Sequence, residues 1–195
     1  MERHAIDHDI ELVTRAAELS GGDMLFLVSC SEIVDAEIRS RYKHSLVLHG
    51  SDLPEGRGWS PVVWQVLEGR TTITVTLLEA ADQVDSGDIW AKTTFELAGN
   101  ELADEINKKL FDAELRLMDY ALSNIGLIKP CAQDAARESH YRKRSPEDSR
   151  LNPELSLAEQ FELMRVADPE RFPCYFDHRG YRYILHLKKA GQKGD

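Results

Sequence analysis

The sequence predicts an α/β protein with a Rossmann-like, mostly parallel sheet flanked by helices and a small C-terminal helix plus β-hairpin appendage. Two apolar runs, 24–28 and 45–49, have the character of strands buried on both faces, and a helical pattern separates them. The amphipathic stretch 100–125 supplies a long helix to cover the sheet. These three observations favour a strand–helix–strand unit inside a layered α/β domain.

Periodicity and stop signals place the remaining elements of the N-terminal part. Helical spacing of apolar residues predicts helices over 10–19, 31–42, 61–68 and 100–125, and Gly69 and Gly126 end the last two. β-Branched residues and apolar–polar alternation predict two further strands, at 72–78 and 89–97. The D-S-G-D sequence at 85–88 forms the turn before the second of them.

The C-terminal third divides into a polar stretch and a small folded unit. Residues 129–152 are charged and contain Pro130 and Pro146, which predicts a linker lying across the first domain. A helix at 156–166 and a hairpin of strands 172–176 and 181–187 follow, too few elements to be stable alone. We therefore divide the chain into a catalytic domain at 1–128, a linker at 129–152 and a C-terminal subdomain at 153–195.

Composition excludes several classes of protein. The formal net charge of -10 weighs against a nucleic-acid-binding face, which needs many Lys and Arg residues. The sequence has neither a signal peptide nor an apolar run of membrane-spanning length, so we expect no membrane association. Cys30, Cys131 and Cys174 form no C-x-x-C pair, and the histidines show no ligand spacing. We expect a cytoplasmic protein without a metal.

The chemistry-bearing residues lie where strands end. His49 closes the second strand and a Gly-rich loop follows it, at the edge where open α/β sheets bind ligands. A neutral imidazole there can accept a proton from an attacking amine, and Asp85 can orient it. From residue types alone, the favoured interpretation of both positions is structural: a strand-end histidine with satisfied hydrogen bonds and a simple D-S-G-D turn.

Four motifs in order raise the catalytic interpretation above the structural one. They are H-G-S-D-L-P-E-G-R-G from His49, S-P-V-V-W-Q-V-L-E-G from Ser60, T-V-T-L-L-E from Thr74 and V-D-S-G-D-I from Val84. Over residues 23–125 the chain resembles the formyltransferase family, which includes methionyl-tRNA formyltransferase and sugar N-formyltransferases. The resemblance implies a Rossmann-like catalytic domain and 10-formyltetrahydrofolate as co-substrate.

The resemblance also implies roles for individual residues. His49 and Asp85 match the family's catalytic His and Asp. The residues expected to bind the folate are Ser51, Asp52, Leu53 and Pro54, with Asp52 in place of a family Leu, and Ala80 and Asp82 after the third strand.

Two departures from the family pattern stand out. Val47 occupies the position of an Asn that holds the oxyanion of the tetrahedral intermediate, and losing one such donor costs about 100- to 1000-fold in turnover. Ser45, on the same strand face, is the nearest polar replacement and a candidate catalytic residue; His44, a donor from elsewhere, or an impaired enzyme are the alternatives. The family also has a complete strand–helix–strand start before Met24, so its first strand is expected to be missing here.

The C-terminal segments indicate the acceptor. Residues 141–151 resemble the linker of formyltransferases that act on nucleotide-linked amino sugars. Arg142, Lys143 and Arg144 could lie against a diphosphate, and Trp59 or Tyr141 could stack on a base or sugar, although a solvated charge run is equally compatible. Arg57 is a further candidate substrate-binding residue. We predict an N-formyltransferase for such a sugar; the alternatives are methionyl-tRNA formylation and a catalytically silent folate or nucleotide-sugar binding module. The sugar enzymes of the family are often dimers, which leaves a homodimer open.

Overall fold

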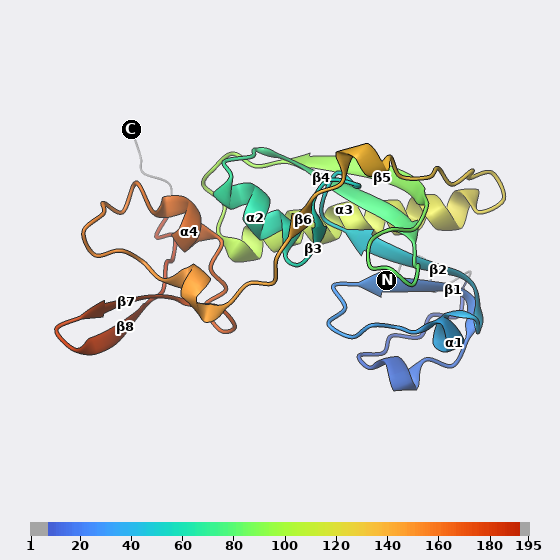
Figure 1. Ribbon diagram of the computed structural model, residues 1–195, viewed down its shortest axis with the longest axis horizontal. Coiled ribbons are helices and arrows are strands. Elements are labelled where there is room, and N and C mark those ends of the chain that lie inside the picture. The colour runs from blue at the N-terminus through green and yellow to red at the C-terminus, as the bar shows by residue number, and fades with distance from the viewer. Residues whose placement is uncertain (1–7, 192–195) are drawn as a thin grey trace.

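The computed structural model describes residues 8–191 and centres on a four-stranded sheet in the order β1-β2-β4-β5 (Figure 1). The strands are β1 (Gly22–Val28), β2 (Tyr42–His49), β4 (Thr72–Glu79) and β5 (Ile89–Glu96). The α/β class is confirmed. Parallel pairing joins β1 to β2, whereas β2–β4 and β4–β5 are antiparallel. Parallel pairing therefore holds for the first two strands only, and no strand precedes β1 within residues 8–21.

The long predicted helix and the sheet form the core. α3 (Ala103–Asn124) packs against β4 and β5, and α2 (Pro61–Leu67) follows the short strand β3 (Arg57–Gly58). The strand residues most deeply enclosed between these layers have no exposed surface: Leu46, Ile73, Val75 and Leu77. The apolar runs of the sequence are therefore the buried strands of the sheet, and their β-branched and Leu side chains form the core.

The helix expected over 10–19 is wrong, because only one 3₁₀ turn, η1 (Ala16–Glu18), forms there. The Glu18 carboxylate accepts hydrogen bonds from the backbone N–H groups of Thr14 and Arg15, at 3.3 and 3.2 Å. Glu32 accepts the N–H of Ala16 at 2.9 Å. Side chains that satisfy backbone donors in this way compete with a continuing helix.

The helix expected over 31–42 is reduced to α1 (Ala36–Arg39). Asp35 caps it by accepting the N–H of Ile38 at 2.9 Å, which fixes its start later than Ser31. Its end is also early, because Tyr42 already pairs with Gly22 in the sheet.

The C-terminal part runs along the sheet and then forms a separate small unit (Figure 1). Residues 129–152 contain η2 (Ala135–Arg137), β6 (His140–Tyr141), which pairs with β3, and η3 (Pro146–Ser149). The expected hairpin is confirmed as β7 (Cys174–His178) and β8 (Tyr181–Leu185), while the helix shortens to α4 (Phe161–Arg165). Val166 packs into the main core, so this unit depends on the first.

Within residues 8–191, no helix has the length and apolar character that crossing a membrane requires. That part of the chain also holds no group of three or more His, Cys, Asp or Glu residues arranged to bind a metal. Cys30, Cys131 and Cys174 are all free thiols.

Candidate active site

His49, the last residue of β2, is buried between a backbone carbonyl and a carboxylate. Its Nε2 lies 2.8 Å from the carbonyl oxygen of Gly56, and its Nδ1 lies 3.5 Å from Oδ1 of Asp85. The predicted pair is therefore brought together, with each side chain under 10% exposed.

The two contacts of the imidazole ring define its hydrogen positions. A carbonyl oxygen can only accept, so Nε2 carries a hydrogen and donates to Gly56. A neutral ring then presents a lone pair at Nδ1 to the Asp85 carboxylate, whereas the imidazolium can donate to both partners. To accept a proton from an amine at Nε2, the ring must leave the Gly56 carbonyl and carry its one hydrogen on Nδ1, where the Asp85 carboxylate can accept it.

Asp85 is held in position by backbone groups from two directions. Its Oδ2 accepts the N–H of Gly58 at 2.9 Å. Its backbone has φ of 57°, a left-handed conformation that Asp and Asn tolerate better than most residues. A Cβ on Gly87 would lie 2.0 Å from the carbonyl oxygen of Glu79, so the D-S-G-D turn requires glycine there.

Gln133 ties this turn to the linker, a role that sequence reasoning missed. Its Nε2 donates to the carbonyl oxygens of Asp85 and Gly87 at 2.9 and 2.8 Å. Its Oε1 accepts from Arg57 Nη2 at 2.7 Å, and Glu138 pairs with the same guanidinium at 2.7 Å. Arg57, expected at the substrate, is therefore a buried structural group. No signal in the polar stretch 129–152 singles out Gln133 or predicts its partners.

The loop expected to bind folate is packed beneath the linker. Ser51, Leu53 and Pro54 are buried, and Asp52 is half-buried. Lys92 Nζ lies 2.5 Å from Asp52 and donates to the Leu53 carbonyl at 2.6 Å. The Ser51 hydroxyl is enclosed and has no hydrogen-bond partner among the described residues. The loop directly follows His49 in the chain, but its side chains have little solvent-exposed surface with which to contact a ligand.

Ser45 and Ala80 line a separate hollow of about 270 Å³ with Arg39, Ser40 and Glu79. The Ser45 hydroxyl donates to the Arg39 carbonyl at 3.3 Å. Asp82 forms an ion pair with Arg39. Hydroxyl, carboxylate and guanidinium groups therefore gather around this hollow.

Ser45 stands four residues before His49 on the same strand, about 13 Å along it. Val47 lies between them on that face, as the alternation of a strand requires. His44 lies on the opposite face in a T-shaped contact with Trp90, the two ring centroids 5.2 Å apart. The structure thus does not bring Ser45 or His44 to the catalytic pair.

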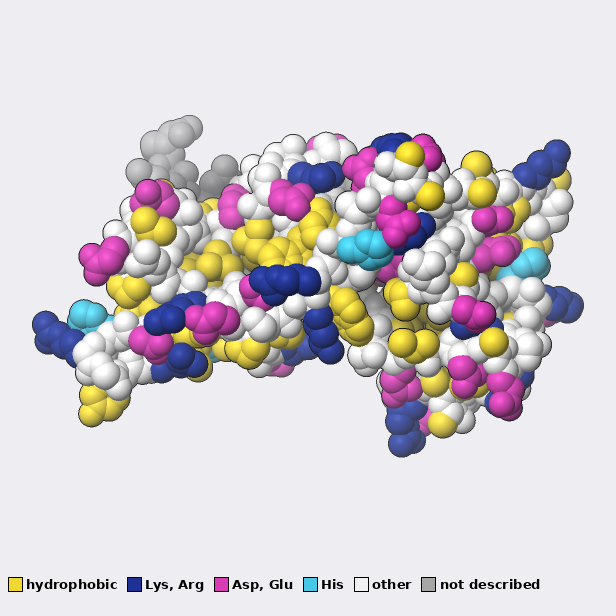
Figure 2. Space-filling model, viewed as in Figure 1, with side chains coloured by type: hydrophobic (Ala, Val, Ile, Leu, Met, Phe, Trp, Pro, Cys, Tyr) yellow, Lys and Arg dark blue, Asp and Glu magenta, His cyan; other side chains and the backbone are white. Residues whose placement is uncertain are grey.

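The expected aromatic residues lie on a surface strip with cationic partners. Trp59, 41% exposed, has Lys143 Nζ 4.6 Å from its ring centroid. Trp64 stacks with Tyr141 at 6.4 Å and carries the Arg142 guanidinium at 4.7 Å. Figure 2 shows hydrophobic side chains beside cationic ones over α2 and β6. We call these five residues the aromatic–cationic strip.

The remaining members of the predicted substrate set are already engaged. Burial and the neighbouring Glu68 carboxylate raise the pKa of Tyr141 to about 12, so its hydroxyl stays neutral and donates to Glu68 at 2.8 Å. Arg142 also pairs with Asp148. Arg144 is buried over Phe172 and donates to Ser149 at 3.1 Å, which gives it a structural role.

The family model described as formyl transferase matches residues 3–122. The chain belongs to this family. Membership confirms formyl transfer as the reaction class and 10-formyltetrahydrofolate as the family's co-substrate. The catalytic interpretation of the four motifs is therefore favoured over the structural one.

Solved structures with the same fold include three formyltransferase-related proteins. Methionyl-tRNA formyltransferase from Clostridium thermocellum is 23% identical with a TM-score of 0.71, covering 86% of this chain and 74% of that one. A sugar N-formyltransferase from a Shewanella species is 16% identical with a TM-score of 0.70, covering 88% and 71%. HypX from Aquifex aeolicus, solved with tetrahydrofolic acid, is 23% identical with a TM-score of 0.77, covering 88% and only 30%.

Proposed function

We propose that this formyl transferase moves a formyl group from 10-formyltetrahydrofolate to the amine of a nucleotide-linked amino sugar. We place the protein in the cytoplasm and leave a homodimer open. The solved sugar N-formyltransferases with this fold support the acceptor class at the level of fold only.

The observation that carries the proposal is the position of the aromatic–cationic strip. Trp59 directly follows Gly58, whose N–H donates to the Asp85 carboxylate, so the strip begins next to a residue in direct contact with Asp85. Exposed aromatic rings stack on bases and sugars, and cations beside them attract a diphosphate. A nucleotide bound along the strip would therefore point its sugar toward His49.

The proposed reaction needs only proton transfer and positioning from the protein. The co-substrate supplies an activated formyl carbon, with its heterocycle in the hollow lined by Ser45 and Ala80. The acceptor amine attacks that carbon, His49 accepts the amine proton, and His49 returns the proton to the folate nitrogen as the bond between that nitrogen and the formyl carbon breaks. Asp85 stabilises the charged His49. Holding the amine beside the carbon supplies much of the rate acceleration.

No described side chain substitutes for the family Asn at Val47. After it has accepted the amine proton, the protonated His49 is the donor best placed to stabilise the oxyanion of the tetrahedral intermediate. We therefore assign both proton transfer and oxyanion stabilisation to His49 and none to Ser45.

The decisive experiment measures formyl transfer from 10-formyltetrahydrofolate to a panel of nucleotide-linked amino sugars. His49→Ala should lower kcat about 100- to 10,000-fold, whereas His178→Ala, at an exposed His that ends β7, should leave it unchanged. Trp59→Ala should raise KM for the sugar about tenfold without changing KM for the folate. Tyr181→Ala is the matched control, because Tyr181 is an exposed aromatic residue on β8.

Two outcomes would replace the proposal. Formylation of methionyl-tRNA with a steep salt dependence would identify the tRNA reaction. Folate binding without turnover on any acceptor would identify a silent binding module, with the engaged His49 ring and Val47 as its cause.

A further inference from the structure

The neutral His49 ring has one N–H hydrogen and faces two groups that can only accept. Its Nε2 lies 2.8 Å from the Gly56 carbonyl oxygen, and its Nδ1 lies 3.5 Å from the Asp85 carboxylate. Proton transfer at Nε2 requires the tautomer with the hydrogen on Nδ1, and in that tautomer the ring no longer donates to Gly56. Activation of His49 therefore removes the donor from a buried carbonyl, which is unfavourable unless another donor replaces it.

The Gly56 peptide is held in place by the linker. Its N–H donates to the Ser139 hydroxyl at 2.9 Å, and its φ is 75°. A Cβ at this position would lie 2.7 Å from the Tyr141 ring, so the ring packs directly against Gly56. The carbonyl therefore stays in the protein interior after the His49 ring has left it, and its new donor must come from a neighbouring residue.

Ser51 has a hydroxyl next to this peptide. Its Cβ lies 3.1 Å from the position that a Cβ on Gly56 would take. The Ser51 backbone is fixed, because its N–H donates to the His49 carbonyl at 2.9 Å and its carbonyl accepts from Thr76 Oγ1 at 2.6 Å. Its hydroxyl is enclosed and has no hydrogen-bond partner among the described residues. A second state in which this hydroxyl donates would account for an otherwise unfavourable buried polar group.

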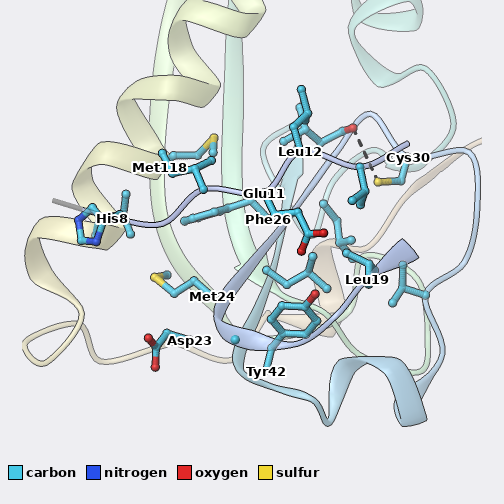
Figure 3. A pocket seen from close by; sticks show the side chains of 18 of the residues that line it. His8, Glu11, Leu12, Leu19, Asp23, Met24, Phe26, Cys30, Tyr42 and Met118 are labelled. Carbon is cyan, nitrogen blue, oxygen red and sulfur yellow. Dashed lines mark hydrogen bonds between the residues drawn. The ribbon is translucent and has the colours of Figure 1, made fainter. Parts of the chain in front are cut away.

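The Ser51 hydroxyl does not line the two hollows found in the described part of the chain. One hollow, of about 970 Å³, lies between β1 and α3, with Met24 and Met118 on its walls (Figure 3). The other is the polar hollow of about 270 Å³ beside β2. Residues 49–58 line neither of them. The acceptor for this hydroxyl is therefore sought in the protein and not in a ligand bound at either hollow.

We propose that Ser51 is a positioning residue for His49, whose hydroxyl donates to the Gly56 carbonyl when the ring releases it. The ring gives up its Nε2 hydrogen to solvent water and takes one from water at Nδ1, so it stays neutral. Nδ1 then donates to Asp85, and the Nε2 lone pair faces the acceptor amine. This inference rests on the proposed function, in which His49 is the base.

Ser51→Ala and Ser149→Ala are a matched pair, because the two serines are 2% and 1% exposed. The Ser149 hydroxyl donates to the Phe172 carbonyl at 3.2 Å, so Ser149→Ala should lower the thermal midpoint and leave kcat unchanged. Ser51→Ala should do the reverse. Its midpoint should stay or rise, because the resting structure loses no hydrogen bond, while kcat should fall about 10- to 100-fold with less than a twofold change in KM for the folate.

The position of the ring hydrogen is measured directly by nitrogen-15 chemical shifts of histidine-labelled protein, without formyl donor. His49→Gln identifies the His49 signals among those of the other histidines. At pH 8, above the ordinary histidine pKa of about 6.5, the wild type should contain both neutral tautomers. Ser51→Ala should shift their ratio toward the Nε2–H form about tenfold, whereas Ser149→Ala should match the wild type.

The readouts separate this inference from the proposed function. If His49→Ala leaves turnover unchanged, the proposed role of His49 fails, and the tautomer ratio still decides whether Ser51 controls the ring. An unchanged tautomer ratio in Ser51→Ala would overturn the inference even where His49 is confirmed as the base. A rise in KM for the folate at unchanged kcat would also overturn it, because Ser51 would then contact the co-substrate instead.

Discussion

The His49–Asp85 centre and the β1 edge lie at neighbouring parts of one sheet, yet they are built in opposite ways. At the centre, both ring nitrogens of His49 face partners, and Asp85 accepts from Gly58 while Gln133 holds its carbonyl. At the β1 edge, a seven-residue apolar strand faces a hollow. Polar groups at the centre are held in place by segments distant in sequence, whereas β1 has a strand on one side only within residues 8–191.

This difference teaches where substitutions should matter. In the turn that carries Asp85, even one added carbon atom on Gly87 would overlap the Glu79 carbonyl oxygen. At the open edge, exposed Leu and Ile side chains have room to change. Activity and stability should therefore be sensitive at the first region and tolerant at the second.

The largest expected effect is on activity, in the closed centre. Asp85→Asn should lower kcat for formyl transfer by about 100- to 10,000-fold, because the charge that faces His49 Nδ1 is lost. Asn tolerates the φ of 57° and can still accept from Gly58, so the thermal midpoint should stay within a few degrees. Steady-state kinetics with a thermal melt checks both, and unchanged kcat would remove Asp85 from the mechanism.

The next effect concerns α3, which borders both regions. Glu114 is buried, its Oε2 has no partner among the described residues, and burial raises its pKa to about 7 from 4.5. Below the unfolded pKa, Glu114 is neutral in both states. Between about pH 4.5 and 7 the unfolded state ionises while native Glu114 stays protonated, so the native state loses about 3 kcal/mol of relative stability by pH 7 and little more above it.

Glu114→Gln should therefore unfold at higher urea than the wild type at pH 8, by up to about 3 kcal/mol, and show little difference at pH 5. Glu154→Gln, at an exposed carboxylate, is the matched control and should show no such pH dependence. A Glu114→Gln difference that is equal at both pH values would show that packing, not ionisation, is responsible.

A pair of glycines compares the two regions directly. Gly87→Ala should destabilise the fold by about 1–3 kcal/mol, because the new methyl group meets the Glu79 carbonyl oxygen at 2.0 Å. Gly22→Ala at the start of β1 meets only the Tyr42 ring at 3.7 Å and should change stability by less than about 1 kcal/mol. Denaturant unfolding of both variants gives the comparison, and equal losses would contradict it.

The smallest effect is expected at the open edge itself. Leu12→Ser, at a side chain 73% exposed, should change the free energy of unfolding by less than about 0.5 kcal/mol. A loss of 2 kcal/mol or more, measured by urea unfolding, would mean that the segment 8–16 seals the edge in solution.

The predicted strands and the long helix agree with the structure better than the two short N-terminal helices do. The strands at 24–28, 45–49, 72–78 and 89–97 and the long helix at 100–125 are found with small shifts, because apolar periodicity encodes burial directly. The helices over 10–19 and 31–42 fail because Glu18, Glu32 and Asp35 satisfy backbone groups through side chains. Such contacts depend on three-dimensional proximity and leave no periodic trace.

Among the predicted site residues, some lie together as expected and others have structural partners instead. His49 and Asp85 were identified from motifs and lie together. Arg57 and Arg144 were expected at the substrate, but their guanidinium groups bond to Gln133 and Ser149 inside the protein. Whether an arginine serves a ligand or the fold depends on its partners, which a charge count does not reveal.

The sequence by itself predicted the α/β class, the family, the reaction class and His49 with Asp85 as the candidate catalytic pair, because apolar periodicity and ordered motifs are local properties of the chain. Only the tertiary structure decided that residues 131–141 cover the loop after His49, that Ser45 lies apart from His49, and that β1 is an edge strand of the sheet within residues 8–191. These features arise from contacts between segments up to 83 residues apart, such as Gly56 with Ser139. Such long-range contacts are set by the packing of the whole chain and not by any local pattern.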